Sequence, residues 1–174
     1  MKVKSEKHIL IVEDFDQQLQ RYVCMAKELG MIVHIAMNLE KAIWTLTNER
    51  VDILLTDIHL TASIEQNTFE GFELLKTVQA HYPEVLPMVM SSDPKVETYR
   101  ESMTLGACHY MKKPIISVDE LKIAVQAAYD KRESLAIHKR SASHRVPRDI
   151  LLKAKDGDFA IWLRILQKQL PSMR

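Results

Sequence analysis

The sequence predicts a doubly wound α/β fold, in which a sheet of five parallel strands has helices on both faces. Short apolar segments alternate with segments of helical periodicity over about the first 132 residues, as in repeated βαβ units. The segments 51–57 and 86–91 are almost continuously apolar, which is typical of strands that helices cover on both sides. The five strands are expected at 8–13, 31–36, 51–57, 86–91 and 108–112.

A helix is expected after each strand. The first should run over 16–29, with its apolar residues on one face and Gly30 as its terminating residue. Asn38 is expected to cap the second helix, and the third should begin near Phe69. Pro94 suits the first turn of the fourth helix, which should end before Gly106.

The fifth helix is expected to be long. Ser117 and Glu120 have the spacing of a capping box at its start, and no stop signal follows until Ser141. The helix should therefore continue to Arg140, beyond the length that covering the sheet requires. A linker is expected at 141–147.

Two parts are expected in the chain: residues 1–132 form the α/β domain, and 133–174 hold the extended fifth helix, the linker and a C-terminal helix capped by Asp158. That helix has an apolar stripe, which packs on the parent domain or contacts a second copy or another partner: Phe159, Trp162, Leu163, Leu166 and Leu170. Residues 133–174 are too few for a winged-helix DNA-binding domain. We expect either a stand-alone domain or the front of a longer protein.

The composition is that of a globular protein, with 47% hydrophobic and 27% charged residues. No apolar run is long enough to span a bilayer, so the cytoplasm is the expected location and no membrane partner is expected. Residues 141–174 carry a net charge of +4 and residues 1–140 one of −3, so no large nucleic-acid surface is expected. Cys24 and Cys108 have apolar neighbours and are expected to be buried, reduced thiols.

Charged and hydroxyl side chains follow four of the expected strands. Glu13 and Asp14 follow the first strand, Asp57 ends the third, Ser91 and Ser92 follow the fourth, and Lys113 follows the fifth. The carboxyl ends of parallel strands meet at one edge of an open sheet, where such folds bind their ligands. Carboxylates that share a site repel one another and require a cation, and Mg²⁺ prefers oxygen ligands. The sequence therefore predicts a magnesium site that handles phosphate.

Each group of this constellation has a chemical use. The Asp57 carboxylate can attack phosphorus and form an acyl phosphate, and Asp14 with Glu13 supplies the metal site. One serine hydroxyl can donate to a phosphoryl oxygen, and the Lys113 ammonium can pair with the same group or with Asp57. Pro114 makes the bond after Lys113 a candidate for the cis form.

Over about residues 6–132 the sequence resembles the receiver domain of two-component response regulators, in particular the chemotaxis type. The resemblance is carried by the Glu13-Asp14 doublet, Asp57, Ser91, and the segment from Gly106 to Pro114. Ser91 lies 22 residues before Lys113, which is the family's spacing for the switch hydroxyl. Tyr110, three residues before the lysine, falls at the aromatic switch position.

The resemblance implies a strand order of 2-1-3-4-5 and a phosphorylation-dependent signalling switch. Asp57 would accept a phosphoryl group from a histidine kinase or phosphotransfer protein, with Mg²⁺ held by Glu13, Asp14, Asp57 and the backbone carbonyl of His59. Ser91, Tyr110 and Lys113 would respond to the phosphoryl group and reshape the face of the fourth helix, fifth strand and fifth helix. A homodimer through that face, or through the C-terminal helix, is a further expectation.

The same resemblance predicts no enzyme beyond slow self-dephosphorylation, with His59 and Asp93 at the positions that tune its rate. One departure from the family is clear, because the glycine expected about eight residues after the phosphoacceptor is here Gly71, at +14. A loop at 61–70 is therefore about six residues longer than usual and lies beside the site. It is either a tolerated insertion or a partner contact.

Three other functions are weaker interpretations of the same residues. A phosphatase of the haloacid-dehalogenase type would have an Asp two residues after its nucleophile, where this chain has His59. A flavodoxin-type binder would need glycine and hydroxyls after the first strand, where Glu13 and Asp14 repel phosphate. A receiver that works without phosphorylation, as an interaction or dimerisation module, is the alternative that remains.

Overall fold

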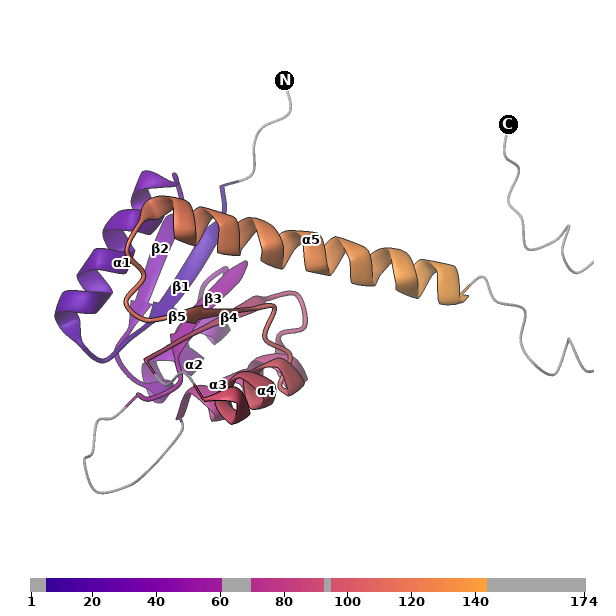
Figure 1. Cartoon of the computed structure of the whole chain (residues 1–174), viewed down its shortest axis with the longest axis horizontal. Coiled ribbons are helices and arrows are strands. Elements are labelled where there is room, and N and C mark those ends of the chain that lie inside the picture. The colour runs from indigo at the N-terminus through magenta and orange to yellow at the C-terminus, as the bar shows by residue number, and fades with distance from the viewer. Residues whose placement is uncertain (1–5, 61–69, 93–94, 144–174) are drawn as a thin grey trace, which may run out of the picture. The chain divides into compact units, whose positions relative to one another are not determined.

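The computed structural model describes residues 6–60, 70–92 and 95–143, with side chains up to Ser134 (Figure 1). The chain divides into two units, Met1–Glu133 and Ser134–Arg174, and the account below concerns the first. The expected C-terminal helix capped by Asp158 lies outside the described residues, as do the loop at 61–69, Asp93 and Pro94.

Five strands and five helices alternate along the described chain. The strands are β1 (His8–Val12), β2 (Ile32–Ala36), β3 (Ile53–Asp57), β4 (Leu86–Ser91) and β5 (His109–Lys112). The helices are α1 (Asp16–Glu28), α2 (Leu39–Asn48), α3 (Glu70–His81), α4 (Val96–Thr104) and α5 (Val118–Ser143). All four strand pairs are parallel and the order is β2-β1-β3-β4-β5, which confirms the predicted fold and strand order.

The sheet is buried on both faces because successive strand residues point to opposite sides. Ile9 and Ile11 of β1 pack in one cluster with residues of α1 and α5, whereas Leu10 and Val12 pack in another with residues of α2 and α3. A third cluster joins α3 and β4 to the segment after α4. Figure 1 shows the same arrangement, with α1 and α5 on one face of the sheet and α2, α3 and α4 on the other.

The local signals for four helix ends are confirmed. The Asn38 side chain accepts a hydrogen bond from the Lys41 amide at 2.9 Å, as an N-cap should. Gly30 and Gly106 follow α1 and α4 with φ angles of +72° and +90°, a region that favours glycine. Ser117 Oγ accepts from the Glu120 amide at 3.2 Å, and the Glu120 carboxylate accepts from the amide of Ile116 at 3.1 Å.

Two expectations are wrong. Cys24 is exposed, because the buried stripe of α1 includes Leu19, Val23 and Ala26 and leaves position 24 on the solvent side. Cys108, directly before β5, is half-buried. Residues 141–143 belong to α5 rather than to the linker, since a serine alone does not end a helix whose hydrogen-bonding pattern continues. Among the described residues, no helix is long and apolar enough to cross a membrane.

Candidate functional site

The side chains predicted to form the site lie at the carboxyl edge of the sheet, each at or directly after the end of a strand. Glu13 and Asp14 directly follow β1, Asp57 is the last residue of β3, and Ser91 is the last of β4. Lys113 directly follows β5, and its amide donates to the Ser91 carbonyl at 2.8 Å. The parallel register of the strands therefore brings together residues that are up to 100 positions apart.

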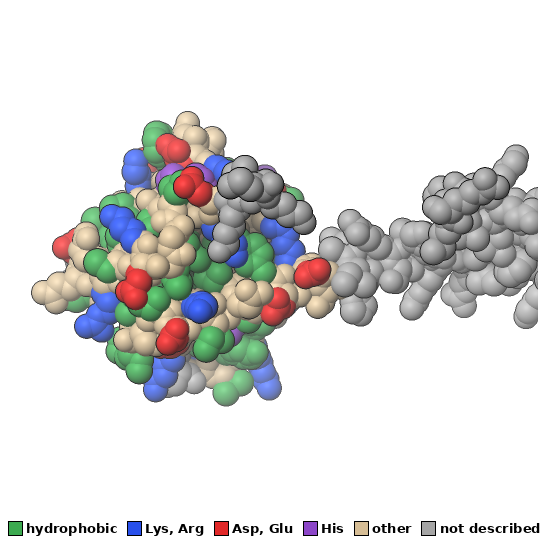
Figure 2. Space-filling view, turned by 90° about the horizontal axis from the view of Figure 1, so that it is seen from above, with side chains coloured by type: hydrophobic (Ala, Val, Ile, Leu, Met, Phe, Trp, Pro, Cys, Tyr) green, Lys and Arg blue, Asp and Glu red, His purple; other side chains and the backbone are tan. Residues whose placement is uncertain are grey.

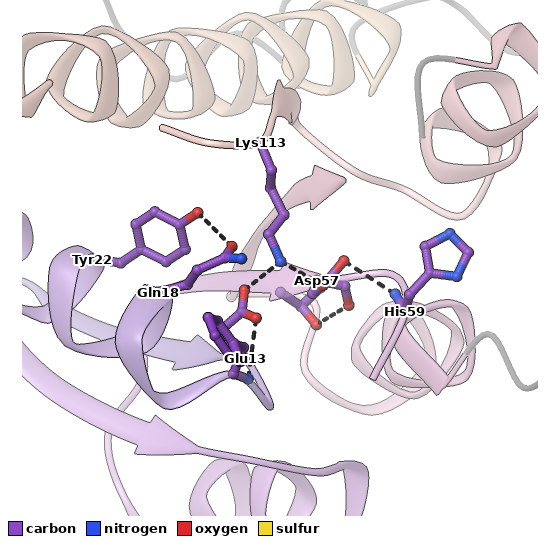
Figure 3. A network of polar contacts seen from close by, with 8 residues as sticks. Glu13, Gln18, Tyr22, Asp57, His59 and Lys113 are labelled. Carbon is purple, nitrogen blue, oxygen red and sulfur yellow. Dashed lines mark hydrogen bonds and ion pairs between the residues drawn. The ribbon is translucent and has the colours of Figure 1, made fainter. Parts of the chain in front are cut away.

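The Lys113 ammonium bridges two buried carboxylates. Its Nζ lies 2.7 Å from Glu13 Oε2 and 2.7 Å from Asp57 Oδ2, as Figure 3 shows. The side chains of Lys113, Glu13 and Asp57 are only 8%, 1% and 7% exposed. Water is therefore largely excluded, and these charge-assisted bonds are stronger than they would be on the surface.

Burial and the neighbouring charges shift the pKa values of Lys113 and Glu13 in opposite directions. Burial alone would lower the pKa of Lys113, but the hydrogen bonds and charges of Asp57 and Glu13 outweigh it and raise that pKa. Burial raises the pKa of Glu13, and its hydrogen bond and ion pair with Lys113 oppose that rise without cancelling it. The ammonium is thus firmly protonated, and burial makes the negative charge of Glu13 costly.

The remaining carboxylate oxygens are oriented by backbone amides. The His59 amide donates to Asp57 Oδ1 at 3.1 Å, and the Phe15 amide donates to Glu13 Oε1 at 3.3 Å. One carboxylate oxygen of Asp57 therefore accepts a hydrogen bond from the Lys113 ammonium, and the other accepts one from the His59 amide. Such fixed partners hold the carboxylate in one orientation at the strand end.

Glu13, Asp14 and Asp57 together have the chemistry of a magnesium site. Each offers a carboxylate oxygen, and these three oxygens lie within 4.8 Å of one another. Three carboxylates and one ammonium leave two negative charges when all are ionised, which one divalent cation balances. An all-oxygen set that lies partly open to water suits Mg²⁺, so the residues fit the metal that the sequence predicts.

Gly71 lies against the backbone that leads out of Asp57. A Cβ atom at Gly71 would stand 2.3 Å from the Asp57 carbonyl oxygen and 2.5 Å from Ile58 Cα, far inside contact distance. The Gly71 amide also donates to the Ile58 carbonyl at 3.1 Å. The close approach to the Asp57–Ile58 backbone therefore requires a glycine at this position, 14 residues after Asp57.

The other predicted residues that the structure describes lie on β4, on β5 and directly after β3. Ser91 is fully buried. Tyr110 is half-buried on β5, and its ring meets that of Tyr99 edge to face at a centroid distance of 5.6 Å. The bond between Lys113 and Pro114 is cis, as predicted. The switch roles of Ser91, Tyr110 and Lys113, and the tuning role of His59, remain predictions.

Sequence reasoning missed Tyr22. This tyrosine is fully buried on α1, and its hydroxyl donates to Gln18 Oε1 at 3.2 Å next to the lysine network (Figure 3). Its place three residues after Leu19 indicates the buried face of the helix. No sequence signal identifies the partners of its hydroxyl.

With this geometry described, the chain can be compared with known proteins. Residues 9–126 match the response regulator receiver domain, which is more than half of the chain. The chain belongs to the response regulator receiver family. A phosphorylation-dependent switch is the general function of that family.

Relatives occur in plants and bacteria. The putative two-component response regulator ARR13 of Arabidopsis thaliana is 32% identical over 120 residues, covering 65% of this chain and 20% of that protein. The regulatory protein AtoC of Escherichia coli is 31% identical over 121 residues, covering 69% and 24%. The transcriptional regulatory protein CitT of Bacillus subtilis is 25% identical over 130 residues, covering 74% and 54%. This receiver chain therefore spans from about a fifth to a half of these relatives.

Solved receiver structures share the fold. A CheY-like receiver domain protein from Methanospirillum hungatei aligns with a TM-score of 0.64 at 24% identity, covering 75% of this chain and 99% of that one. The chemotaxis response regulator CheY4 of Vibrio cholerae aligns with a TM-score of 0.61 at 21% identity, covering 71% and 99%. The described elements of this receiver thus form a known arrangement.

Proposed function

We propose that this receiver takes a phosphoryl group on Asp57 from a histidine kinase or phosphotransfer protein and relays the change to a partner. The observation that carries the proposal is the Lys113 ammonium, held 2.7 Å from both Asp57 and Glu13 in a largely buried site. A structural ion pair needs one carboxylate, whereas this lysine serves two and a third lies beside them.

In the proposed transfer, one carboxylate oxygen of Asp57 forms a bond to phosphorus, and the bond from phosphorus to the donor nitrogen or oxygen breaks. The donor group leaves with that electron pair, so the product on this chain is an acyl phosphate. Glu13, Asp14, Asp57 and the backbone carbonyl of His59 are the proposed holders of Mg²⁺, which when bound neutralises phosphoryl oxygens. Lys113 keeps its proton throughout and supplies a fixed positive charge.

The product changes the charge balance of the site. A phosphoryl group brings about two negative charges to a place where Lys113 already joins two carboxylates. We propose that Ser91 and Lys113 move to bond the new oxygens, and that Tyr110 turns inward as Ser91 leaves its present place. Because Tyr110 contacts Tyr99 of α4, such a turn would alter the outer face of that helix.

The face formed by α4, β5 and α5 is the proposed contact for a partner or a second copy of the chain. Apolar side chains reach the surface of the molecule (Figure 2), and four large ones belong to α4, to α5 and to the turn before α5: Val96, Tyr99, Ile116 and Ile123 are 55%, 47%, 76% and 67% exposed. Their exposure costs solvation free energy that a contact would recover. The proximity of Tyr99 to Tyr110 supports a link between this face and the site.

The phosphorylation proposal is tested by mass spectrometry of the intact protein. The protein is incubated with Mg²⁺ and a small acyl-phosphate donor, and we expect the mass of one phosphoryl group to be added. Asp57→Asn should abolish the addition. Asp52→Asn, which changes a carboxylate just before the start of β3, should leave it unchanged. No addition to the wild type, or full addition to Asp57→Asn, contradicts the proposal and favours a receiver that works without phosphorylation.

Magnesium is expected to stabilise the folded protein, because the ion relieves repulsion among carboxylates that only folding brings together. At a free Mg²⁺ concentration 100 times its Kd, the free energy of unfolding should rise by about 2.7 kcal/mol. Urea unfolding at matched ionic strength measures this. Asp14→Asn should need several-fold more Mg²⁺ for the same gain. An equal response in wild type and variant would remove Asp14 from the site.

A further inference from the structure

Thr56 is a fully buried polar residue directly before Asp57, and the phosphoryl chemistry assigns it no role. Its place in the sheet does not require a hydroxyl, because its registered neighbours are Val12 on β1 and Val89 on β4. Valine has the same branched shape as threonine, so a third valine would fill this position without a polar atom to satisfy. The hydroxyl of Thr56 therefore requires an explanation.

The hydroxyl binds the backbone at the point where β3 ends. Thr56 Oγ1 donates to the carbonyl oxygen of Asp57 at 2.8 Å, and both residues are buried. Threonine side chains that bond to nearby backbone groups offer the chain an alternative to the regular ladder of a sheet. The bond therefore fixes the direction of the Asp57 carbonyl where the chain leaves β3, and burial protects it from competing water.

Two peptide groups connect this carbonyl to the amide that orients the Asp57 carboxylate. The first joins Asp57 to Ile58 and carries the carbonyl that Thr56 binds. The second joins Ile58 to His59, and its carbonyl accepts from the Gly71 amide at 3.1 Å. Its amide, that of His59, donates to Asp57 Oδ1 at 3.1 Å, as Figure 3 shows. Each peptide group is planar, so a rotation of the first group displaces the second and the hydrogen bond that it makes to the carboxylate.

We propose that Thr56 is a positioning residue: its hydroxyl holds the first peptide group after Asp57, so that the His59 amide reaches Asp57 Oδ1. The inference rests on the proposed function, because the orientation of this carboxylate matters most when it attacks phosphorus. A shift of about 1 Å in a positioned group can cost up to about 100-fold in rate. Thr56 acts through the backbone, so its loss should slow the reaction in part rather than abolish it.

The test compares variants at two buried threonines. Thr56→Val removes the bond to the Asp57 carbonyl, whereas Thr56→Ser retains a hydroxyl that can make it. Thr45→Val is the matched control, because Thr45 is also buried and its Oγ1 donates to the Lys41 carbonyl at 2.9 Å. Thr45 lies on α2, which contributes no residue to the predicted site. The rate of phosphorylation at saturating Mg²⁺ is measured with a radiolabelled acyl-phosphate donor.

Rescue by serine separates positioning from a general loosening of the core. We expect Thr56→Val to slow phosphorylation about 3- to 10-fold, within the range that mispositioning allows. Thr56→Ser should recover most of the wild-type rate, and Thr45→Val should keep it. A wild-type rate in Thr56→Val, no recovery in Thr56→Ser, or equal slowing in Thr45→Val would overturn the inference.

A second readout needs no phosphorylation. The NMR signal of the His59 amide proton reports its hydrogen bond to Asp57 Oδ1. This signal should move toward that of a solvent-exposed amide in Thr56→Val and stay in place in Thr45→Val. If the wild type takes no phosphoryl group, the proposed function fails, and this signal alone decides the inference. An unchanged His59 signal in Thr56→Val would then reject the role of Thr56.

Discussion

Replacing Lys113 with alanine is expected to destabilise the folded protein by about 3 kcal/mol at neutral pH. The change removes the ammonium that Glu13 and Asp57 share and leaves two buried carboxylates without their counter-charge. Breaking a buried ion pair from one side costs about 3 to 5 kcal/mol, because the remaining charge stays desolvated. Urea unfolding measures the difference, and Lys112→Ala, at the exposed neighbouring lysine, is the matched control.

The pH dependence of that difference has a definite sign. The raised pKa of Lys113 gives the wild type a stabilisation that is fully present below the lysine's unfolded pKa and is lost as the pH rises through the folded pKa. In the variant, the pKa of Glu13 is raised by burial without the opposing lysine, so acid protonates Glu13 and removes its buried charge. The destabilisation should therefore be largest near neutral pH and shrink on both sides. A difference that grows below neutral pH would contradict the ion-pair account.

Replacing Gly71 with alanine is expected to destabilise the protein by about 3 kcal/mol and to slow phosphorylation more than 10-fold. The added Cβ would stand 2.3 Å from the Asp57 carbonyl oxygen, and that neighbour is backbone, which yields less readily than a side-chain end. Either α3 or the end of β3 must move, and the second movement displaces the Asp57 carboxylate. Urea unfolding and intact-mass kinetics measure the two effects.

Gly30→Ala is the matched control for this glycine. Gly30 has a φ angle of +72° and no atom within 4 Å of an added Cβ, so its substitution costs backbone strain alone, about 1 kcal/mol. Phosphorylation should stay at the wild-type rate, because Gly30 follows α1 at the end remote from Asp14. Equal effects of both substitutions on the phosphorylation rate would show that Gly71 has no special contact with Asp57.

The sequence predicted the fold because its local signals, the apolar runs and the residues at helix ends, agree with the alternation of strands and helices along the chain. Continuous apolar runs predicted β3 and β4, whose every residue is buried, and Asn38 and Gly30 marked helix ends that the structure confirms. A side chain that faces solvent within an apolar stretch is harder to predict, as Cys24 shows, because its exposure depends on which stripe of α1 packs on the sheet.

The sequence predicted those site residues that lie at or directly after the end of a strand. Glu13, Asp14, Asp57 and Lys113 lie together because parallel strands end at one edge. The sequence did not show that Lys113 bridges two carboxylates, nor that Gly71 contacts the Asp57–Ile58 backbone, because both depend on distances between remote segments.

The central claim is that Asp57 is the residue that carries the phosphoryl group, and chemical trapping tests it most directly. The protein is treated with Mg²⁺ and an acyl-phosphate donor and then with borohydride, which reduces an acyl phosphate to a primary alcohol. Peptide mass spectrometry locates the reduced residue. The account predicts reduction at Asp57 alone, dependent on both donor and Mg²⁺. Reduction at another carboxylate, or none in a properly folded sample, would contradict it.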